Sequence, residues 1–169
     1  MYVVPRTGTS NSVLKATTGS TPALYHALYS RKLFGAKIIG SVNVYPLAKI
    51  WDPKKLTMYN GSCLDNGVFI YNVAMVSIGE RSVISREAKL CTATHDYNID
   101  SFDLKTKPIN IMNDAWICMD VFIAPGVTVG SFGVALARSV ILSDISNYEV
   151  FLGNPAKCVK LRKEINSQI

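Results

Sequence analysis

Aliphatic residues recur at every sixth position through most of the chain. Three rounds begin at Ile38, Met58 and Ile78, and after an interruption at 91–110 the step of six resumes at Ile111. The full set of anchor positions is Ile38, Val44, Ile50, Leu56, Met58, Leu64, Ile70, Val76, Ile78, Ile84, Leu90, Ile111, Ile117, Ile123, Val129, Ala135 and Ile141. This period matches neither the 3.6-residue repeat of an α-helix nor the alternation of a simple strand.

The six-residue period predicts a coil of short strands in which every sixth side chain points inward and three hexads close one triangular turn. Small or β-branched residues that would fit the corners stand two positions before many anchors: Ala48, Ser62, Val68, Ala74, Ser82, Ala88, Ala115, Val121 and Val127. Gly, Asn or Asp would supply the positive φ at bends such as SIGERS, NGVF and TVGSFG. An ordinary β-sandwich would give this spacing only by chance, so we expect a stacked coil that buries one aliphatic column.

The remaining segments divide the chain into an N-terminal part, 1–35, and a coil domain, 36–169. Residues 7–21 are mostly Thr, Ser, Gly and Asn and indicate an irregular arm. A short helix follows, with Thr21 as its cap, Pro22 in its first turn and Gly35 at its end. A long loop is expected at about 91–110, and the basic segment AKCVKLRKEI should form a short helix or tail.

Composition limits the class of protein. A chain of 169 residues makes one domain, and its four cysteines form no CxxC pair, so we expect reduced thiols and no zinc site. No apolar run approaches the roughly 18 to 20 residues of a membrane span, and no signal peptide is apparent, so we expect a cytoplasmic protein. A net charge of +6 favours an anionic partner. Nucleic acid is not expected, because no recognisable basic and aromatic module is present.

The long loop carries the most reactive candidate side chain. It contains LCTATHDYN with His95, whereas the only other histidine, His26, falls in the expected helix and suits a packing or surface role. Long loops in compact domains are usually functional or disordered, and histidine side chains ordinarily titrate near neutral pH. His95 is therefore the side chain of this loop whose role most needs an explanation.

The ordered set of motifs resembles a known family. Hexad repeats, a loop bearing THDYN, then AWI, FIAPGVTVG and GNPAK are similar to the left-handed parallel β-helix acyltransferases of the hexapeptide-repeat type, from about Phe34 to Lys160. The most similar branch contains the colanic-acid and capsular-polysaccharide O-acetyltransferases, with maltose and galactoside acetyltransferases as cousins. The resemblance implies a left-handed coil, acetyl-CoA as acyl donor, a sugar hydroxyl as acceptor, no metal, and a homotrimer whose site is shared between subunits.

The resemblance also implies roles for single residues. His95 matches the catalytic histidine, which would deprotonate the acceptor hydroxyl for direct attack on the thioester without an acyl-enzyme. Asp96, or else a backbone carbonyl, could orient its imidazole. On the acceptor side the matching positions are Asn72, Asp96 and Trp116.

The cofactor side departs in part from the family pattern. Met119, Ala137 and Lys160 match positions that contact acetyl-CoA. Relatives commonly read VVGAGSVVTKDVP where this chain has VALARSVILSDIS, which replaces two glycines by Leu136 and Arg138. Arg138 and the basic end that includes Lys157 are candidates for binding a coenzyme phosphate.

Three functions of different classes fit these observations. The first is an O-acetyltransferase acting on a sugar or glycan intermediate. The second is a degenerate β-helix that serves as a scaffold or binding subunit, which the altered VALARSV segment suggests. The third is a metal lyase of the γ-carbonic-anhydrase kind, which needs three histidine ligands per zinc and is strongly disfavoured by two histidines per chain.

Overall fold

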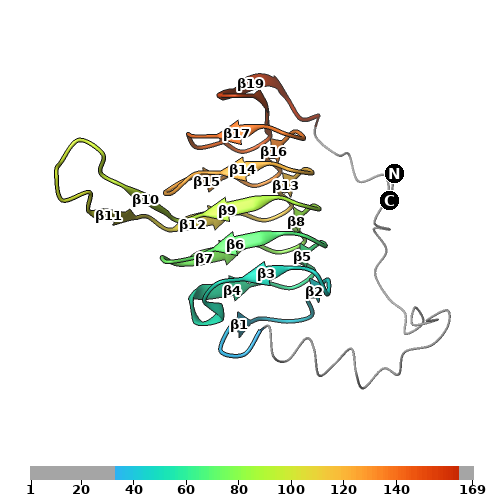
Figure 1. Ribbon diagram of the computed structural model, residues 1–169. Coiled ribbons are helices and arrows are strands. Elements are labelled where there is room, and N and C mark those ends of the chain that lie inside the picture. The colour runs from blue at the N-terminus through green and yellow to red at the C-terminus, as the bar shows by residue number, and fades with distance from the viewer. Residues whose placement is uncertain (1–32, 164–169) are drawn as a thin grey trace, which may run out of the picture.

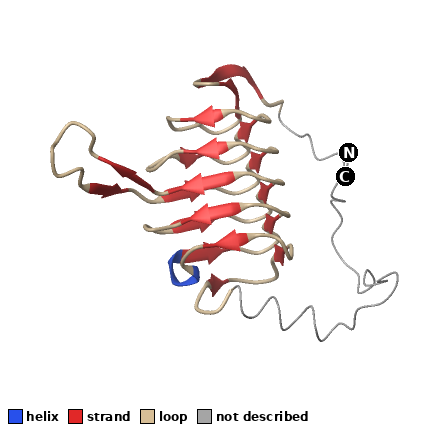
Figure 2. Ribbon diagram, viewed as in Figure 1, coloured by secondary structure: helices blue, strands red, loops and turns tan. Residues whose placement is uncertain are grey.

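The computed structural model describes residues 33–163, which form a left-handed parallel β-helix of stacked triangular coils (Figures 1 and 2). The expected arm, the helix beginning at Thr21 and His26 lie outside the described residues. Within residues 33–163 the helical structure is a single 3₁₀ turn, Pro53–Lys55. No helix in this part of the chain is long and apolar enough to cross a membrane.

Each coil contributes one strand to each of three flat faces. Face 1 contains β1 (Lys37–Ile38), β4 (Leu56–Met58), β7 (Val76–Ile78), β12 (Ile109–Ile111) and β15 (Thr128–Val129). Face 2 contains β2 (Asn43–Val44), β5 (Cys63–Leu64), β8 (Val83–Ile84), β13 (Trp116–Ile117), β16 (Val134–Ala135), β18 (Glu149–Gly153) and β19 (Ala156–Leu161). Face 3 contains β3 (Lys49–Ile50), β6 (Phe69–Tyr71), β9 (Lys89–Cys91), β14 (Phe122–Ile123) and β17 (Val140–Ile141).

The anchors predicted from the hexads form the core. On face 1, Met58 pairs with Ile78 and Ile78 with Ile111, and all three are buried. The rule weakens in the first coil, where Ile38 pairs with Met58 but remains 36% exposed because no described coil lies beneath it. Every other anchor except Ile50 is buried, which confirms the expected aliphatic column.

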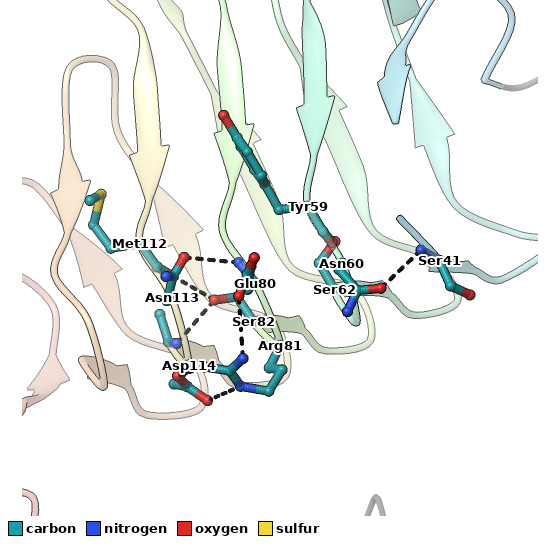
Figure 3. A network of polar contacts seen from close by, with 11 residues as sticks. Ser41, Tyr59, Asn60, Ser62, Glu80, Arg81, Ser82, Met112, Asn113 and Asp114 are labelled. Carbon is teal, nitrogen blue, oxygen red and sulfur yellow. Dashed lines mark hydrogen bonds and ion pairs between the residues drawn. The ribbon is translucent and has the colours of Figure 1, made fainter. Parts of the chain in front are cut away.

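The corners combine asparagine braces with left-handed backbone. At the corner between faces 1 and 2, Asn60 Oδ1 accepts the N–H of Ser41 at 3.0 Å and Asn113 Oδ1 accepts that of Glu80 at 3.0 Å (Figure 3). Among the described residues, positive φ occurs at Gly, as expected, but also at eight other residues: Arg81, Glu87, Phe102, Asp114, Asp120, Phe132, Arg138 and Tyr148. Two of these eight are Asp and none is Asn, so the expectation that Gly, Asn or Asp would fill the bends was too narrow.

Contacts between successive coils explain why large side chains occupy these bends. Arg81 donates to both carboxylate oxygens of Asp114 one coil further on, at 2.9 and 2.6 Å (Figure 3). Further along the same corner the rings of Phe132 and Tyr148 stack with centroids 4.8 Å apart. Contacts that depend on the left-handed conformation offset its steric cost.

Two segments differ from their sequence-based expectations. The loop at 91–110 contains an antiparallel hairpin, β10 (Ala93–His95) and β11 (Leu104–Thr106), which projects away from the stack (Figure 1). The basic segment was expected to be a short helix or tail, but its first six residues form β19, which pairs antiparallel with β18 and continues face 2. All of its residues except Ala156 are exposed, so the strand lies on the surface.

Candidate active site

His95 occupies the last position of β10, on the projecting hairpin. Its side chain is exposed, and Nδ1 lies 2.7 Å from the backbone oxygen of Phe102. The Phe102 ring stacks on the imidazole with centroids 4.4 Å apart and planes 6° from parallel. Two contacts from one residue therefore fix both the plane and the rotation of the imidazole.

The hydrogen bond also determines which ring nitrogen is free. A carbonyl oxygen only accepts, so Nδ1 carries the hydrogen and donates it to Phe102. In the neutral imidazole the lone pair is then on Nε2, which makes no hydrogen bond within residues 33–163. Of the two orienting groups considered from the sequence, a backbone carbonyl performs this role.

Phe102 was not singled out from the sequence. It adopts φ +49°, a conformation that is uncommon for an aromatic residue. Such backbone outliers cluster at functional sites, where surrounding contacts maintain them. The available signal was a phenylalanine within a mostly polar loop, but its contact with His95 depends on hairpin geometry.

Asp96 and Cys91 are both engaged in local contacts. Asp96 Oδ1 accepts the backbone N–H of Asn98 at 3.1 Å, so this carboxylate shapes the loop. Cys91 is half-buried at the end of β9, and its thiol donates to the backbone oxygen of Ala93 at 3.1 Å. The geometry gives neither residue a contact with the imidazole of His95.

Asn72 is buried at the corner between faces 3 and 1. Its Oδ1 accepts the backbone N–H of Asp52 at 3.0 Å, and its Nδ2 donates to the backbone oxygen of the same residue at 2.6 Å. Asn60, Asn66 and Asn113 brace neighbouring coils in a similar way. This geometry therefore lends no support to the acceptor contact implied by the resemblance.

Trp116 projects from β13 on face 2. Its indole N–H donates to Ser85 Oγ at 2.9 Å, which anchors the ring, while the residue remains 48% exposed. An anchored, half-exposed ring is suited to forming the wall of a binding site. The β10–β11 hairpin leaves the corner between faces 3 and 1, on the opposite side of the prism from β13 (Figure 1).

Three of the predicted cofactor residues meet at the corner between faces 2 and 3. The backbone N–H of Arg138 donates to the oxygen of Met119 at 3.0 Å, and Ala137 directly precedes Arg138. Arg138 adopts φ +62°, so the left-handed turn is present although arginine replaces a glycine. Leu136 packs partly buried against the core.

The charges at this corner leave Arg138 loosely held. Lys89 Nζ lies 2.8 Å from Asp120 Oδ1, whereas Arg138 Nε lies 3.7 Å from Asp120 Oδ2. The pKa of Asp120 is lowered chiefly by the hydrogen bond and charge of Lys89, with Arg138 making a smaller contribution. Since Lys89 already neutralises this carboxylate, the exposed Arg138 guanidinium is available to an anion.

Lys157 and Lys160 lie on β19, which pairs with β18 at the upper end of face 2. Lys157 pairs with Leu152 and Lys160 with Val150, so Lys157 lies nearer the corner that carries Arg138. Both lysines are exposed. The structure thus groups Lys157 with the corner residues and places Lys160 further along the strand.

Cys63 and Cys118, on the side of face 2, have surroundings that disfavour the reactive thiolate form. Burial raises the pKa of Cys118 to about 11, although a backbone hydrogen bond from Ala137 acts in the opposite direction. The pKa of Cys63 is also raised to about 11, by burial first and by the charge of Asp65 second. Among residues 33–163 no group of three or more His, Cys, Asp or Glu side chains could hold a metal ion.

Comparison with solved structures identifies the class of fold. A hexapeptide-repeat acetyltransferase from Vibrio cholerae, solved with acetyl coenzyme A, has a TM-score of 0.75 and 26% sequence identity and covers 86% of this chain and 80% of its own. A maltose O-acetyltransferase from Clostridium difficile 630 has a TM-score of 0.75 and 25% identity, covering 87% of this chain and 80% of its own. No protein-family model matches the chain.

Sequence comparison identifies the family. The chain is 39% identical over 133 residues, 79% of its length, to a provisionally named colanic acid biosynthesis acetyltransferase, WcaF, from Escherichia coli K12, and covers 73% of that protein. An acetyltransferase-like protein of Schizosaccharomyces pombe is 34% identical over 105 residues, which is 60% of this chain and 47% of its own. The chain belongs to the hexapeptide-repeat acetyltransferases, and within them it is similar to WcaF.

Proposed function

We propose that the protein transfers an acetyl group from acetyl-CoA to a hydroxyl of a sugar or glycan intermediate, with His95 as general base. The observation that carries the proposal is the hydrogen bond from His95 Nδ1 to the Phe102 carbonyl, which leaves Nε2 free to accept a proton. Family membership supports acetyl transfer, and the similarity to WcaF and to a maltose O-acetyltransferase supports a sugar acceptor.

In the proposed reaction His95 Nε2 removes the proton from the acceptor hydroxyl as its oxygen attacks the thioester carbonyl. The carbon–sulfur bond then breaks, and the proton passes from Nε2 to the departing coenzyme sulfur. The products are an acetyl ester and free coenzyme A, so no acyl-enzyme is formed. The Phe102 carbonyl keeps the imidazolium oriented while it carries the proton, because Nδ1–H remains a donor throughout.

The proposed donor site lies at the corner formed by Met119, Ala137 and Arg138, with Lys157 and Lys160 on β19 above it. A left-handed turn and exposed cations are suitable for a phosphate-bearing ligand. Because the turn is retained at Arg138, the altered VALARSV segment does not by itself favour the scaffold alternative. Trp116 is the proposed wall on the acceptor side.

The proposed assembly is a homotrimer with a site shared between chains. The His95 hairpin leaves the corner between faces 3 and 1, whereas the donor residues lie at the corner between faces 2 and 3 and Trp116 lies on face 2. Packing three copies around an axis would allow the hairpin of one chain to approach these residues in the next.

Calorimetric titration with acetyl-CoA, followed by an acetyl-transfer assay on sugar acceptors, tests the proposal. Saturable binding together with release of coenzyme A that depends on a sugar is the expected result. Binding without transfer to any hydroxyl would contradict the proposed reaction, and absence of binding would favour a scaffold.

A further inference from the structure

A charged cluster at the proposed donor site contains one acid that the proposed reaction does not explain. Lys89, Asp120 and Arg138 lie together at the corner between faces 2 and 3. Lys89 Nζ is 2.8 Å from one carboxylate oxygen of Asp120, and Arg138 Nε is 3.7 Å from the other. A carboxylate repels a phosphate-bearing ligand, so an acid at this position needs a reason.

Strand register places the acid directly below Arg138 in the stack. β14 pairs with β9 on one side and with β17 on the other. Glu87, Asp120 and Arg138 each stand two residues before the first paired residue of these strands, so they hold equivalent positions in three successive coils. All three have left-handed backbone, with φ of +60°, +56° and +62°. With strands about 4.8 Å apart, Asp120 is one coil from Arg138 and Glu87 is two coils, about 10 Å, away.

Arg138 is the least restrained member of the cluster. Lys89 Nζ also donates to the backbone oxygen of Glu87 at 2.9 Å, so two contacts hold this ammonium group. The separation of 3.7 Å between Arg138 and Asp120 exceeds the length of a hydrogen bond, and the arginine side chain is 85% exposed. A phosphate that offered two oxygens to the guanidinium would therefore bind it more strongly than Asp120 does.

A buried hydroxyl brings a second cation toward Arg138. Ser139, the next residue, is fully buried, and its Oγ accepts the backbone N–H of Gly153 at 3.1 Å. Gly153 is the last residue of β18, and the short turn after it leads to β19 with Lys157. This turn is thus fastened to the corner that carries Arg138. An anion between the two cations would lie on the side of Arg138 away from Asp120.

The geometry favours competition between Asp120 and such an anion over orientation of Arg138 by Asp120. A carboxylate that orients an arginine makes a close, paired contact with it, as Asp114 does with Arg81 at 2.9 and 2.6 Å. Asp120 makes no hydrogen bond to Arg138, and its shorter contact is with Lys89. Its negative charge nevertheless lies one coil below the anion, whose charge it opposes.

We propose that Asp120 is a competing counter-ion of the donor site: a coenzyme phosphate replaces it as the partner of Arg138, and its charge weakens the binding of coenzyme A. This inference rests on the proposed function, because it assumes that coenzyme A binds at this corner. It adds a residue that limits how tightly the product is held. Coenzyme A must leave after every transfer before the next molecule of acetyl-CoA binds.

Calorimetric titration of Asp120→Asn with coenzyme A, at low ionic strength and without any acceptor, tests the proposal. The amide keeps the size of the side chain and removes its charge. We expect Asp120→Asn to bind coenzyme A about three- to tenfold more tightly than the native protein, because the repulsion is lost. Affinity for pantetheine, which lacks the phosphates, should not change. Added salt should shrink the gain, because it screens exposed charges.

Glu87→Gln is the matched control. Glu87 is exposed, makes no ion pair within residues 33–163, and stands one coil further from Arg138 than Asp120 does. This variant changes the net charge by the same amount and should alter coenzyme A affinity by less than about twofold. Equal gains in the two variants would overturn the proposal by revealing a general effect of charge. Unchanged or weaker binding in Asp120→Asn would also overturn it, and weaker binding would show that Asp120 orients Arg138.

A double variant identifies the cation that the phosphate uses. When Arg138→Ala is already present, adding Asp120→Asn should strengthen coenzyme A binding by less than about twofold, because the two side chains act as a pair. A gain that persisted in full would show that the phosphate pairs with the released Lys89, and would overturn the role given to Arg138.

Inorganic pyrophosphate separates this inference from the proposed function. If neither protein bound coenzyme A but pyrophosphate bound more tightly to Asp120→Asn than to the native protein, the donor assignment would be refuted and the counter-ion would stand. Conversely, sugar-dependent acetyl transfer together with equal coenzyme A affinities of the two proteins would refute only the counter-ion.

Discussion

The chemistry at the scale of single residues depends on His95 and the one residue that orients it. Phe102 supplies both the carbonyl that accepts from Nδ1 and the ring that stacks on the imidazole. A ring held at two points loses little further freedom when a proton is transferred, which is the advantage of a preorganised base. Cys91, the nearest potential nucleophile along the chain, is instead engaged with the Ala93 carbonyl.

Replacing His95 should therefore affect turnover far more than replacing Cys91. His95→Ala is expected to lower the turnover of acetyl-CoA with a competent acceptor by about 10² to 10⁴, the usual contribution of a general base. Coenzyme affinity should change little, because the imidazole acts on the acceptor proton. Cys91→Ala should retain most activity. Steady-state kinetics and calorimetry of both variants provide the measurement.

The opposite pattern would require a different mechanism. If Cys91→Ala lost all turnover while His95→Ala kept it, the acetyl group would pass through an acyl-cysteine. Mass spectrometry of the protein after incubation with acetyl-CoA alone would then detect a covalent acetyl group.

The cysteines should also differ in their reactivity. The pKa of Cys118 is raised to about 11 because burial disfavours the thiolate, whereas Cys158 is exposed on β19. Only the thiolate reacts with iodoacetamide, so at pH 8 Cys158 should be alkylated first and Cys118 at least tenfold more slowly. As pH rises toward 11, the thiolate fraction of Cys118 increases about tenfold per unit. Peptide mapping checks this, and rapid labelling of Cys118 at pH 8 would contradict it.

Arg138 provides a test of the proposed donor site. Its guanidinium is 3.7 Å from Asp120, whose charge is mainly held by Lys89. If Arg138 binds a coenzyme phosphate, Arg138→Ala should weaken coenzyme A binding by about five- to tenfold but leave a pantetheine fragment, which lacks the phosphates, nearly unaffected. Calorimetry with both ligands makes the comparison. Equal losses for the two ligands would reject the phosphate role.

At the scale of elements, the corners stabilise the stack through contacts between successive coils. Arg162, just after β19, completes the corner between faces 1 and 2. Its Nη1 donates to the backbone oxygens of Asp114 at 3.2 Å and Phe132 at 3.3 Å, and its guanidinium carbon lies 5.8 Å from the centre of the Phe132 ring. The chain end is thereby fastened to two coils below.

Removing the Arg162 side chain should loosen this end. Arg162→Ala loses two charge-assisted hydrogen bonds and a cation–π contact, which predicts a destabilisation of about 1–2 kcal/mol. Lys163→Ala is the matched control, since Lys163 is an exposed neighbour. Urea denaturation at fixed protein concentration measures the difference. Equal denaturation midpoints for the two variants would show that the Arg162 contacts contribute nothing to stability.

The sequence predicted the repeating elements because a single rule governs them. Residues such as Leu64, Ile84 and Ile117 share one register on face 2, so the hexad identifies the buried positions without any long-range information. The hexad does not predict burial where a residue lacks a neighbouring coil, as at Ile38, which remains exposed. It also cannot show that β19 folds back on β18, because antiparallel pairing leaves no trace in a six-residue period.

The candidate site was harder to predict. The sequence singled out His95 by its residue type and its loop, but the orienting carbonyl and ring of Phe102 depend on the turn between β10 and β11. Asn72 shows a structural role that the sequence did not reveal: the amide that matched a functional position makes one accepted and one donated hydrogen bond with the backbone of Asp52. Sequence motifs identify side chains with suitable chemistry, whereas the contacts that each side chain makes in the folded chain are visible only in the structure.

At the scale of the whole molecule, the triangular prism separates the parts of the proposed site. The β10–β11 hairpin, which carries His95, leaves one corner, and β13 lies on the opposite side of the prism (Figure 1). Trp116 lies on β13, and Arg138 lies at another corner, between β16 and β17. One chain therefore carries all the proposed parts without bringing them together. A closed ring of three copies places different corners of neighbouring chains against each other.

We therefore expect a homotrimer, with a mass by light scattering of about 55 kDa for three chains of 18.5 kDa each. Only monomer at micromolar concentration would contradict both the trimer and the shared site. A mass above that of the monomer shows assembly, but it does not show that two chains complete one site.

Complementation between inactive variants tests that sharing directly. A chain with His95→Ala still supplies Trp116, and a chain with Trp116→Ala still supplies His95 on its hairpin. If each site takes His95 from one chain and Trp116 from the next, random mixed trimers should contain native pairs at about a quarter of their sites. Co-expression of the two variants should then restore activity that neither shows alone. Mixed trimers as inactive as the single variants would mean that each chain builds its own site, despite the distance between hairpin and face 2.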